Sequence, residues 1–221
     1  MTTPIAQQPE LAFEYIDCGG IKVAHLANLD GGGPRTWPDF VRMTKEHVGP
    51  VNHAYEWCAG PGYIGFALLG SGLCETLTVA DINPEAVAAC RETVRQNGLE
   101  DRVNVYLSDN LKEIPATETW DLIIGDPPHF PAPLQRHIDD GFVLRSVDHD
   151  WKVHREFFGT VSAHTKPGTH LLLSESRVAG NNEELIIGLV EKAGFELQGP
   201  IWEYPERTRY CMHARIPGGT R

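Results

Sequence analysis

The sequence predicts an α/β protein with a doubly wound, mostly parallel sheet, because apolar strands and helices alternate from residue 51 onward. The helix expected at 84–97 has Pro84 in its first turn and Gly98 after its end, as helix termini prefer. The strand expected at 120–125 is almost entirely apolar, as in a strand covered on both faces. Seven strands are expected, the last two as an antiparallel terminal hairpin: 51–58, 77–81, 103–107, 120–125, 169–174, 195–198 and 208–216.

The first 50 residues depart from this alternation and are expected to form an extension that covers the ligand site of a domain spanning 51–221. After a polar tail at 1–10, two short apolar runs flank Cys18-Gly19-Gly20 and predict a β-hairpin. Three glycines and two prolines predict a loop at 30–39. A helix is expected to start near Pro38 and to run to residue 47.

The stretch from Tyr55 to Gly65 contains the pattern GxGxxG, at the end of one expected strand and the start of a helix. Glycines at 60 and 62 let the backbone turn sharply and leave no Cβ in the way of a ligand. The helix that starts near Tyr63 directs its free N–H groups toward the same place. The pattern is common to many nucleotide-binding folds, and a turn that binds nothing remains the alternative.

Acidic residues follow the next three expected strands, where ligands bind in open α/β sheets. Asp81 ends the second strand, Asp109 follows the third, and Asp126-Pro127-Pro128-His129 ends the fourth. Each acidic residue alone could be a helix cap or a turn residue. Because all three align with the glycine turn, we expect one binding site at this edge of the sheet.

Composition restricts the class of protein. The 221 residues are 41% hydrophobic and 22% charged, as in a soluble globular protein, and no apolar run is long enough for a membrane helix. The N-terminus lacks a signal-peptide pattern, and five scattered cysteines fit reduced thiols, so a cytoplasmic location is expected. A net charge of −11 without a basic cluster argues against a nucleic-acid substrate.

Residues 51 to about 216 resemble the class I S-adenosylmethionine-dependent methyltransferases, which have a Rossmann-like fold. Residues 56–62 are similar to that family's acidic-x-Gly-x-Gly-x-Gly motif, except that Cys58 replaces the first glycine. Because cysteine is small, we expect the cofactor site to form despite this substitution. The resemblance implies S-adenosylmethionine as the cofactor, with Glu56 near its methionine ammonium and the loop residues along its backbone: Ala59, Gly60 and Gly62.

The same resemblance implies how the adenosine part of the cofactor is held. Asp81 matches the acidic residue that accepts hydrogen bonds from both ribose hydroxyls, and Asp109 matches the one that accepts from the adenine amine. Ile82 and Asn110 would flank the adenine. A short similarity at 33–36 to glutamine-type methyltransferases implies that Arg35 lines the pocket.

An NAD-binding alternative uses the same glycine turn and Asp81, but it explains neither Glu56 nor the tetrapeptide at 126–129. Glu56 would lie beside a pyrophosphate in that case, whereas S-adenosylmethionine carries no phosphate and is cationic. The sequence therefore favours S-adenosylmethionine over a dinucleotide.

The tetrapeptide at 126–129 resembles the (Asn/Asp)-Pro-Pro-(Tyr/Phe) motif of methyltransferases that act on nitrogen. The side chain of Asp126 and the carbonyl of Pro127 can accept hydrogen bonds from an N–H group and so aim its lone pair. His129 replaces the aromatic residue of the motif, and it could stack, act as a base, or have no role. An aspartate at 126 favours an amine or guanidine, whose developing positive charge a carboxylate stabilises.

The segment 130–152 is expected to form a long loop that acts as a substrate lid. It and the following helix contain several potential metal ligands, but their spacing matches no metal motif and no metal is expected: His137, Asp148, His149, Asp150 and His154.

These features predict an enzyme, monomeric or homodimeric and without membrane contact, that methylates a nitrogen of a small molecule. An amino acid or a biosynthetic intermediate is the expected acceptor, because no separate recognition domain is evident. Four alternatives remain open: an enzyme that uses the aminobutyryl chain and releases methylthioadenosine, an adenine methyltransferase on RNA or DNA, a protein side-chain methyltransferase, and a binding module without activity.

Overall fold

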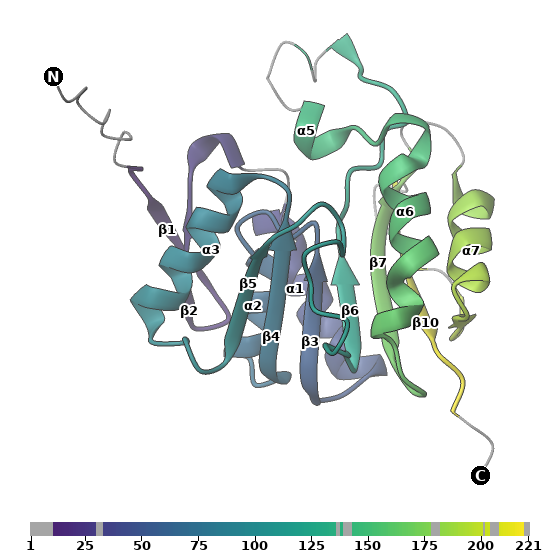
Figure 1. The fold of residues 1–221 in the computed structure, drawn as a ribbon, viewed down its shortest axis with the longest axis horizontal. Helices are drawn as coiled ribbons and strands as arrows, with labels where there is room; N and C mark the ends of the chain where they lie inside the picture. Colours follow the sequence, from purple (N-terminus) through teal and green to yellow (C-terminus); the bar gives the residue numbers. More distant parts are fainter. Residues whose placement is uncertain are drawn as a thin grey trace, which may run out of the picture.

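The centre of the protein is one mixed sheet with the strand order β5-β4-β3-β6-β7-β10-β8, and β9 also pairs with β10 (Figure 1). The computed structural model describes residues 11–29, 33–135, 138, 143–177, 182–200, 202–203 and 208–218. The strands are β3 (Val51–Trp57), β4 (Cys74–Asp81), β5 (Val103–Leu107), β6 (Leu122–Gly125), β7 (His170–Ser176), β8 (Glu196–Leu197), β9 (Trp202–Glu203) and β10 (Arg209–Arg215).

The strands from β5 to β7 pair in parallel, and β10 lies antiparallel to β7, β8 and β9. The predicted mostly parallel sheet with an antiparallel pair near the C-terminus is therefore confirmed. The sequence analysis missed the two-residue strand β9. All four residues of β6 are buried, as its unbroken apolar sequence indicates.

Helices cover both faces of the sheet, as Figure 1 shows. One core contains Phe40, Phe66 and Val94, from three helices on one face. The other core contains Phe157 and Ile186, from two helices on the opposite face. Side chains of β6 alternate between these cores, as expected of a strand. The helices are α1 (Gly33–His47), α2 (Tyr63–Gly70), α3 (Pro84–Asn97), α6 (Lys152–Thr160) and α7 (Glu183–Lys192).

The N-terminal hairpin is formed by β1 (Glu14–Cys18) and β2 (Ile21–His25), as predicted. It lies beside α3, where the backbone N–H of Ala24 donates to the Thr93 hydroxyl at 2.8 Å. The predicted loop at 30–39 is wrong from residue 33 onward, because α1 already begins at Gly33 and contains Pro38. Burial of Phe40 and Met43 against the core stabilises α1 despite that proline. Residues 30–32 lie outside the described part.

The described part of the segment 130–152 is not entirely the loop that the sequence predicts. It contains the short helix α5 (Val143–Ser146) and the 3₁₀ turn His149–Trp151, whereas 136–137 and 139–142 lie outside the described residues. Phe130 forms an isolated parallel bridge with Val147, which ties the start of the segment to its end. The end of the segment therefore lies beside its start before α6 begins.

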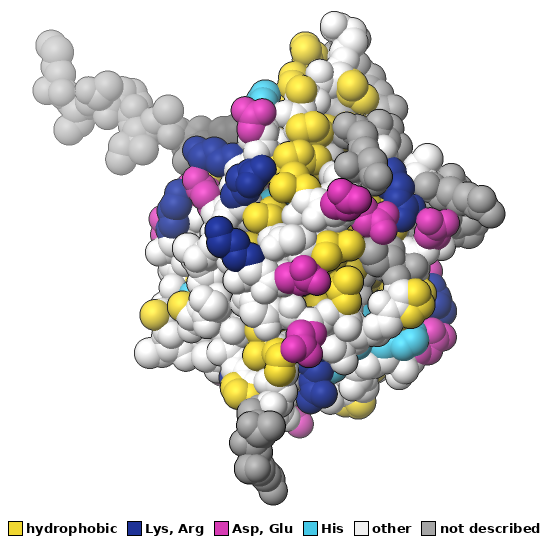
Figure 2. Space-filling model, turned by 90° about the vertical axis from the view of Figure 1, so that its right-hand side faces the viewer, with side chains coloured by type: hydrophobic (Ala, Val, Ile, Leu, Met, Phe, Trp, Pro, Cys, Tyr) yellow, Lys and Arg dark blue, Asp and Glu magenta, His cyan; other side chains and the backbone are white. Residues whose placement is uncertain are grey.

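Figure 2 shows the side of the molecule that lies to the right in Figure 1. Basic side chains gather at the upper left of this face and acidic ones lie across its middle, so the face carries charges of both signs. Within the described residues, no helix is both long enough and apolar enough to cross a membrane.

Candidate functional site

A pocket of about 200 Å³ lies at the carboxyl ends of the parallel strands. Eight of the predicted site residues line it: Glu56, Ala59, Gly60, Asp81, Ile82, Asp109, Asn110 and Asp126. Side chains from 143–153 complete the wall, and the sequence analysis did not single them out: Leu144, Arg145, Val147 and Val153. The expected lid thus contributes to the pocket through its C-terminal half.

The turn after β3 has three residues with left-handed backbone conformations: Cys58 at φ 52°, Gly60 at 53° and Gly62 at 81°. This conformation explains why glycine is the expected residue at position 58. A Cβ on Gly62 would lie 2.7 Å from the Phe66 ring, so Gly62 serves packing and is absent from the pocket wall. No described atom lies within 4 Å of the place a Cβ on Gly60 would take, which leaves room for a ligand there.

Glu56 holds the start of α2 against the end of β3. Its carboxyl group accepts hydrogen bonds from the backbone N–H groups of Gly65 at 2.7 Å and Ile64 at 3.3 Å. Burial raises the pKa of Glu56 to about 8, although these two bonds oppose the rise. The third glycine of the pattern is explained by the same contact, since a Cβ on Gly65 would lie 2.7 Å from Glu56.

Asp81 connects the glycine turn to the next helix. Its carboxylate accepts from the N–H of Gly60 at 2.7 Å and from the N–H of Asn83 at 2.8 Å. Burial raises the pKa of Asp81, and these bonds counteract the rise. The neighbouring Ile82 is 51% exposed although it is apolar and borders the pocket. An exposed apolar side chain beside buried acceptors suits a flat, polar-edged ligand such as a nucleoside.

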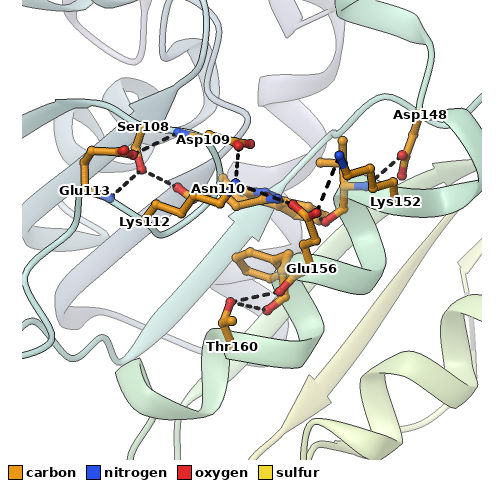
Figure 3. Close-up of polar contacts among 12 residues, drawn as sticks. Ser108, Asp109, Asn110, Lys112, Glu113, Asp148, Lys152, Glu156 and Thr160 are labelled. Carbon is orange, nitrogen blue, oxygen red and sulfur yellow. Dashed lines mark hydrogen bonds and ion pairs between the residues drawn. The ribbon is translucent and has the colours of Figure 1, made fainter.

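The loop after β5 is fixed by contacts to both neighbouring elements, as Figure 3 shows for Asn110 and its surroundings. Asn110 has φ 55°; its side chain accepts from Trp57 Nε1 at 2.9 Å and donates to the Val153 carbonyl at 3.3 Å. Asp109 is half exposed and forms an ion pair with Lys112. A ligand amine at Asp109 would share that carboxylate with Lys112.

The tetrapeptide at 126–129 lies at the inner end of the pocket. Asp126 and Pro128 line the pocket, whereas Pro127 and His129 do not. Among the described residues, neither Asp126 Oδ1 nor His129 Nδ1 has a hydrogen-bond partner, and both atoms are buried. Burial raises the pKa of Asp126, against the influence of His129, Ser174 and Arg209.

A buried chain of three ionisable groups lies behind the tetrapeptide, and the sequence analysis missed its role. His154 contacts Asp148 Oδ2 through Nδ1 and Glu175 Oε1 through Nε2, both at 2.7 Å. Burial alone would lower the pKa of His154, but the charges of Glu175 and Asp148 raise it to about 9. Both ring nitrogens therefore carry protons at neutral pH. The sequence indicates Asp148 and His154 only as potential metal ligands. Glu175 belongs to no sequence motif that would indicate a role.

Arg35 is a further predicted site residue that does not line the pocket. It lies exposed in the first turn of α1. In the described part of the chain, no group of three or more metal-ligating side chains could hold a metal ion. His137 lies outside the described residues.

Comparisons with known proteins identify the fold and the cofactor. Residues 43–148 match the family model of the methyltransferase small domain. The release factor glutamine methyltransferase of Cereibacter sphaeroides is 28% identical over 165 residues, which cover 72% of this chain and 57% of that protein. The ribosomal protein L11 methyltransferase of Alteromonas mediterranea is 37% identical over 91 residues, or 41% of this chain and 29% of that protein.

Solved structures agree at the level of the fold. The T. thermophilus 16S rRNA N2 G1207 methyltransferase, in complex with AdoMet and guanosine, superimposes with a TM-score of 0.63 at 15% identity. The match covers 94% of this chain and 51% of that one. The M. jannaschii tRNA m1G37 methyltransferase gives a TM-score of 0.62 at 18% identity, over 93% and 57% of the two chains.

The predicted class I methyltransferase fold, with S-adenosylmethionine as its cofactor, is confirmed by these comparisons. The chain spans a little over half of the release factor methyltransferase that it matches. The expected small-molecule acceptor finds no support, because the names of these relatives designate protein and RNA substrates. For the same reason the expectation that a nucleic-acid substrate is unlikely finds no support.

Proposed function

Because the chain carries an S-adenosylmethionine-dependent methyltransferase domain, we propose that it transfers a methyl group to a nitrogen atom of a protein side chain. The choice of a nitrogen acceptor rests on one observation. Asp126 lines the pocket, and its buried Oδ1 has no hydrogen-bond partner among the described residues. An acceptor in that position can take an N–H or O–H donor from a ligand in the pocket.

The choice of a protein acceptor rests on the names of the sequence relatives. The curated relatives are designated as acting on a release factor, on ribosomal protein L11 and on ribosomal protein uL3. The net charge of −11 also favours a protein over a polyanionic nucleic acid.

The cofactor-binding half of the pocket fits S-adenosylmethionine, which supplies an electrophilic methyl group on its sulfonium when bound. Asp81 would accept hydrogen bonds from the ribose hydroxyls, while Ile82 and Asn110 flank the adenine and Asp109 accepts from its amine. The open space at Gly60 would admit the cofactor backbone. Glu56, whose two oxygens already bind the start of α2, would interact with the ammonium through its remaining lone pairs.

The other half of the pocket would position the acceptor nitrogen. Asp126 and the carbonyl of Pro127 accept hydrogen bonds from its N–H groups, so that its lone pair faces the methyl group. Positioning of this kind is the main contribution an enzyme makes to a displacement between two bound partners. His129 is 18% exposed and its charge acts on Asp126, so it would carry the released proton outward.

The test is to incubate the purified protein with methyl-labelled S-adenosylmethionine and three fractions of a bacterial extract: proteins, RNA and small metabolites. We expect label in the protein fraction, with release of S-adenosylhomocysteine. Label confined to RNA or metabolites would overturn the proposed acceptor, and release of methylthioadenosine would overturn methyl transfer itself.

A matched pair of variants separates binding from turnover. Asp126→Ala should retain cofactor binding in calorimetry and lose methyl transfer, whereas Asp101→Ala, in an exposed turn, should change neither. Full activity of Asp126→Ala would contradict the role given to that carboxylate.

A further inference from the structure

Four buried polar atoms without hydrogen-bond partners among the described residues belong to neighbouring residues at the tetrapeptide and the end of β7. They are Asp126 Oδ1, His129 Nδ1, Ser174 Oγ and Glu175 Oε2. Glu175 is completely buried at the end of β7, and its Oε2 lies 4.0 Å from His129 Nδ1. The charges of His129 and Glu175 both act on Asp126. Asp126 at the pocket wall and the buried Glu175 behind it therefore each have a carboxylate oxygen with unused acceptor capacity, at a free-energy cost that a bound donor would remove.

The orientation of Glu175 is fixed from behind. Its Oε1 accepts from His154, which donates through its other nitrogen to Asp148. Asp148 in turn accepts from the backbone N–H groups of Val153 at 2.7 Å and His154 at 3.1 Å, so the chain is anchored on the start of α6. Figure 3 shows Asp148 at this helix end. The arrangement leaves Oε2 of Glu175 as the oxygen that faces the tetrapeptide.

The charge at this place favours a cationic ligand. Asp148, Glu175 and Asp126 contribute three carboxyl groups. His154, which bonds to two of them, and Arg209 compensate two of these charges, so one carboxyl group remains uncompensated. Arg209 and His129 also act on Asp126 and oppose the rise of its pKa that burial causes. Ser174, which faces Asp126 from β7, adds a hydroxyl and no charge.

We propose that the acceptor is a guanidinium group, as on an arginine side chain, held by Asp126 Oδ1 and Glu175 Oε2. This inference rests on the proposed function and specifies its substrate class. A guanidinium is planar, always charged and offers five N–H donors without an acceptor, which matches two separate carboxylate oxygens. A primary amide also needs a donor for its carbonyl oxygen, which the Ser174 hydroxyl could supply, so the uncompensated negative charge of the place is what favours the guanidinium over an amide.

The reaction balances with the groups that are present. The guanidinium nitrogen forms a bond to the methyl carbon, the bond between that carbon and the cofactor sulfur breaks, and the sulfonium becomes the thioether of S-adenosylhomocysteine. One proton leaves the same nitrogen and passes to the Asp126 carboxylate, and then through His129 to solvent. The product is a methylguanidinium that keeps its single positive charge.

Binding measurements test the inference separately from turnover. Calorimetry with saturating S-adenosylhomocysteine would compare Nα-acetyl-arginine amide, Nα-acetyl-glutamine amide, Nα-acetyl-lysine amide and free L-arginine. We expect both arginine ligands to bind at least 10-fold more tightly than the glutamine and lysine ligands. Equal affinity for all ligands, or preference for glutamine, would overturn the inference. Tighter binding of free arginine than of its blocked form would support the guanidinium and contradict a protein acceptor.

Two variants locate the binding group. Asp126→Asn and Glu175→Gln should each weaken arginine binding at least 10-fold, while Asp101→Asn, a loss of the same charge at an exposed turn, should not. If Glu175→Gln fails to fold, Asp126→Asn alone decides, and unchanged arginine affinity in it refutes the inference.

Turnover distinguishes the two proposals. Arginine-, glutamine- and lysine-containing peptides would each be incubated with S-adenosylmethionine and analysed by mass spectrometry. Methylation of arginine supports both proposals. Methylation of glutamine or lysine alone keeps the proposed function and refutes the guanidinium, and methylation of no peptide but of RNA refutes both.

Discussion

Replacing Glu56 with glutamine tests whether a protonated, buried carboxyl group supports the glycine turn. Glu56 is 2% exposed and accepts hydrogen bonds from the N–H groups of Ile64 and Gly65. Glutamine has nearly the same shape as the protonated acid and keeps one carbonyl acceptor for these groups. The substitution therefore removes the ionisation of residue 56 and leaves its packing.

The size and sign of the effect follow from the pKa of Glu56, which burial raises from its ordinary 4.5 to about 8. The folded protein holds this proton more tightly than the unfolded chain. The resulting stabilisation is therefore complete below the unfolded pKa and is lost as the pH rises through the folded pKa. At about 1.4 kcal/mol per pH unit, the wild type should lose about 3 kcal/mol of unfolding free energy between about pH 6 and pH 8 through this group.

Urea denaturation at several pH values from 6 to 9 measures the difference. Glutamine leaves one of the two backbone N–H groups without its acceptor, which costs stability at every pH. The difference in unfolding free energy, Glu56→Gln minus wild type, should therefore rise with pH, by about 3 kcal/mol from the lower to the upper end. Glu100→Gln, which removes an exposed carboxylate, should follow the wild type. Parallel pH profiles for wild type and Glu56→Gln would refute the raised pKa.

Three further substitutions test other parts of the site. Cys58→Gly should raise the unfolding free energy by about 1 kcal/mol, because a φ of 52° is strained for an L-residue, and Cys58→Val should lower it. Urea denaturation measures both variants, and a more stable valine variant than glycine variant would contradict this explanation. Asp81→Asn should weaken S-adenosylhomocysteine binding at least 10-fold in calorimetry, and an unchanged Kd would remove Asp81 from the proposed ribose site. His154→Ala should lower the unfolding free energy by about 3–5 kcal/mol, because two buried carboxyl groups lose their shared partner; a loss below about 1 kcal/mol would speak against a charged His154.

The cofactor half of the pocket could be predicted from the sequence because its residues follow directly on strand ends. In a parallel sheet those ends share one edge, so the order of strands and acidic residues along the chain places Asp81 and Asp109 beside the glycine turn. The unusual residue of the turn could also be identified, since Cys58 stands where the motif has glycine. Its left-handed conformation is a property of the folded backbone, and the structure supplied it.

The acceptor half could be predicted only where it coincides with a motif. Asp126 was identified by its two prolines, but Glu175 belongs to the strand β7 itself and has no motif around it. The orientation of Glu175 is fixed by a hydrogen bond to His154, which lies 21 residues earlier in the chain, on α6. Such a contact depends on how a helix packs on a strand, and no short-range spacing encodes it. The start of α1 was missed for a related reason, because buried Phe40 and Met43 outweigh the local preference of glycine and proline for a loop.

The antiparallel strand β10 explains why acceptor groups gather on one side of the site. In register with β7, Arg209 at the start of β10 lies opposite Ser176 at the end of β7. The edge where the parallel strands end is therefore also the edge where β10 begins, and Arg209 comes close enough to influence the pKa of Asp126. Strands β3, β4 and β5 thus supply the proposed cofactor contacts, β6 and β7 supply the proposed acceptor contacts, and β10 supplies the charge of Arg209 beside them. Because these are separate strands, substitutions at Asp81 and at Glu175 should act independently, the first on cofactor affinity and the second on acceptor affinity, and their effects should add in the double variant.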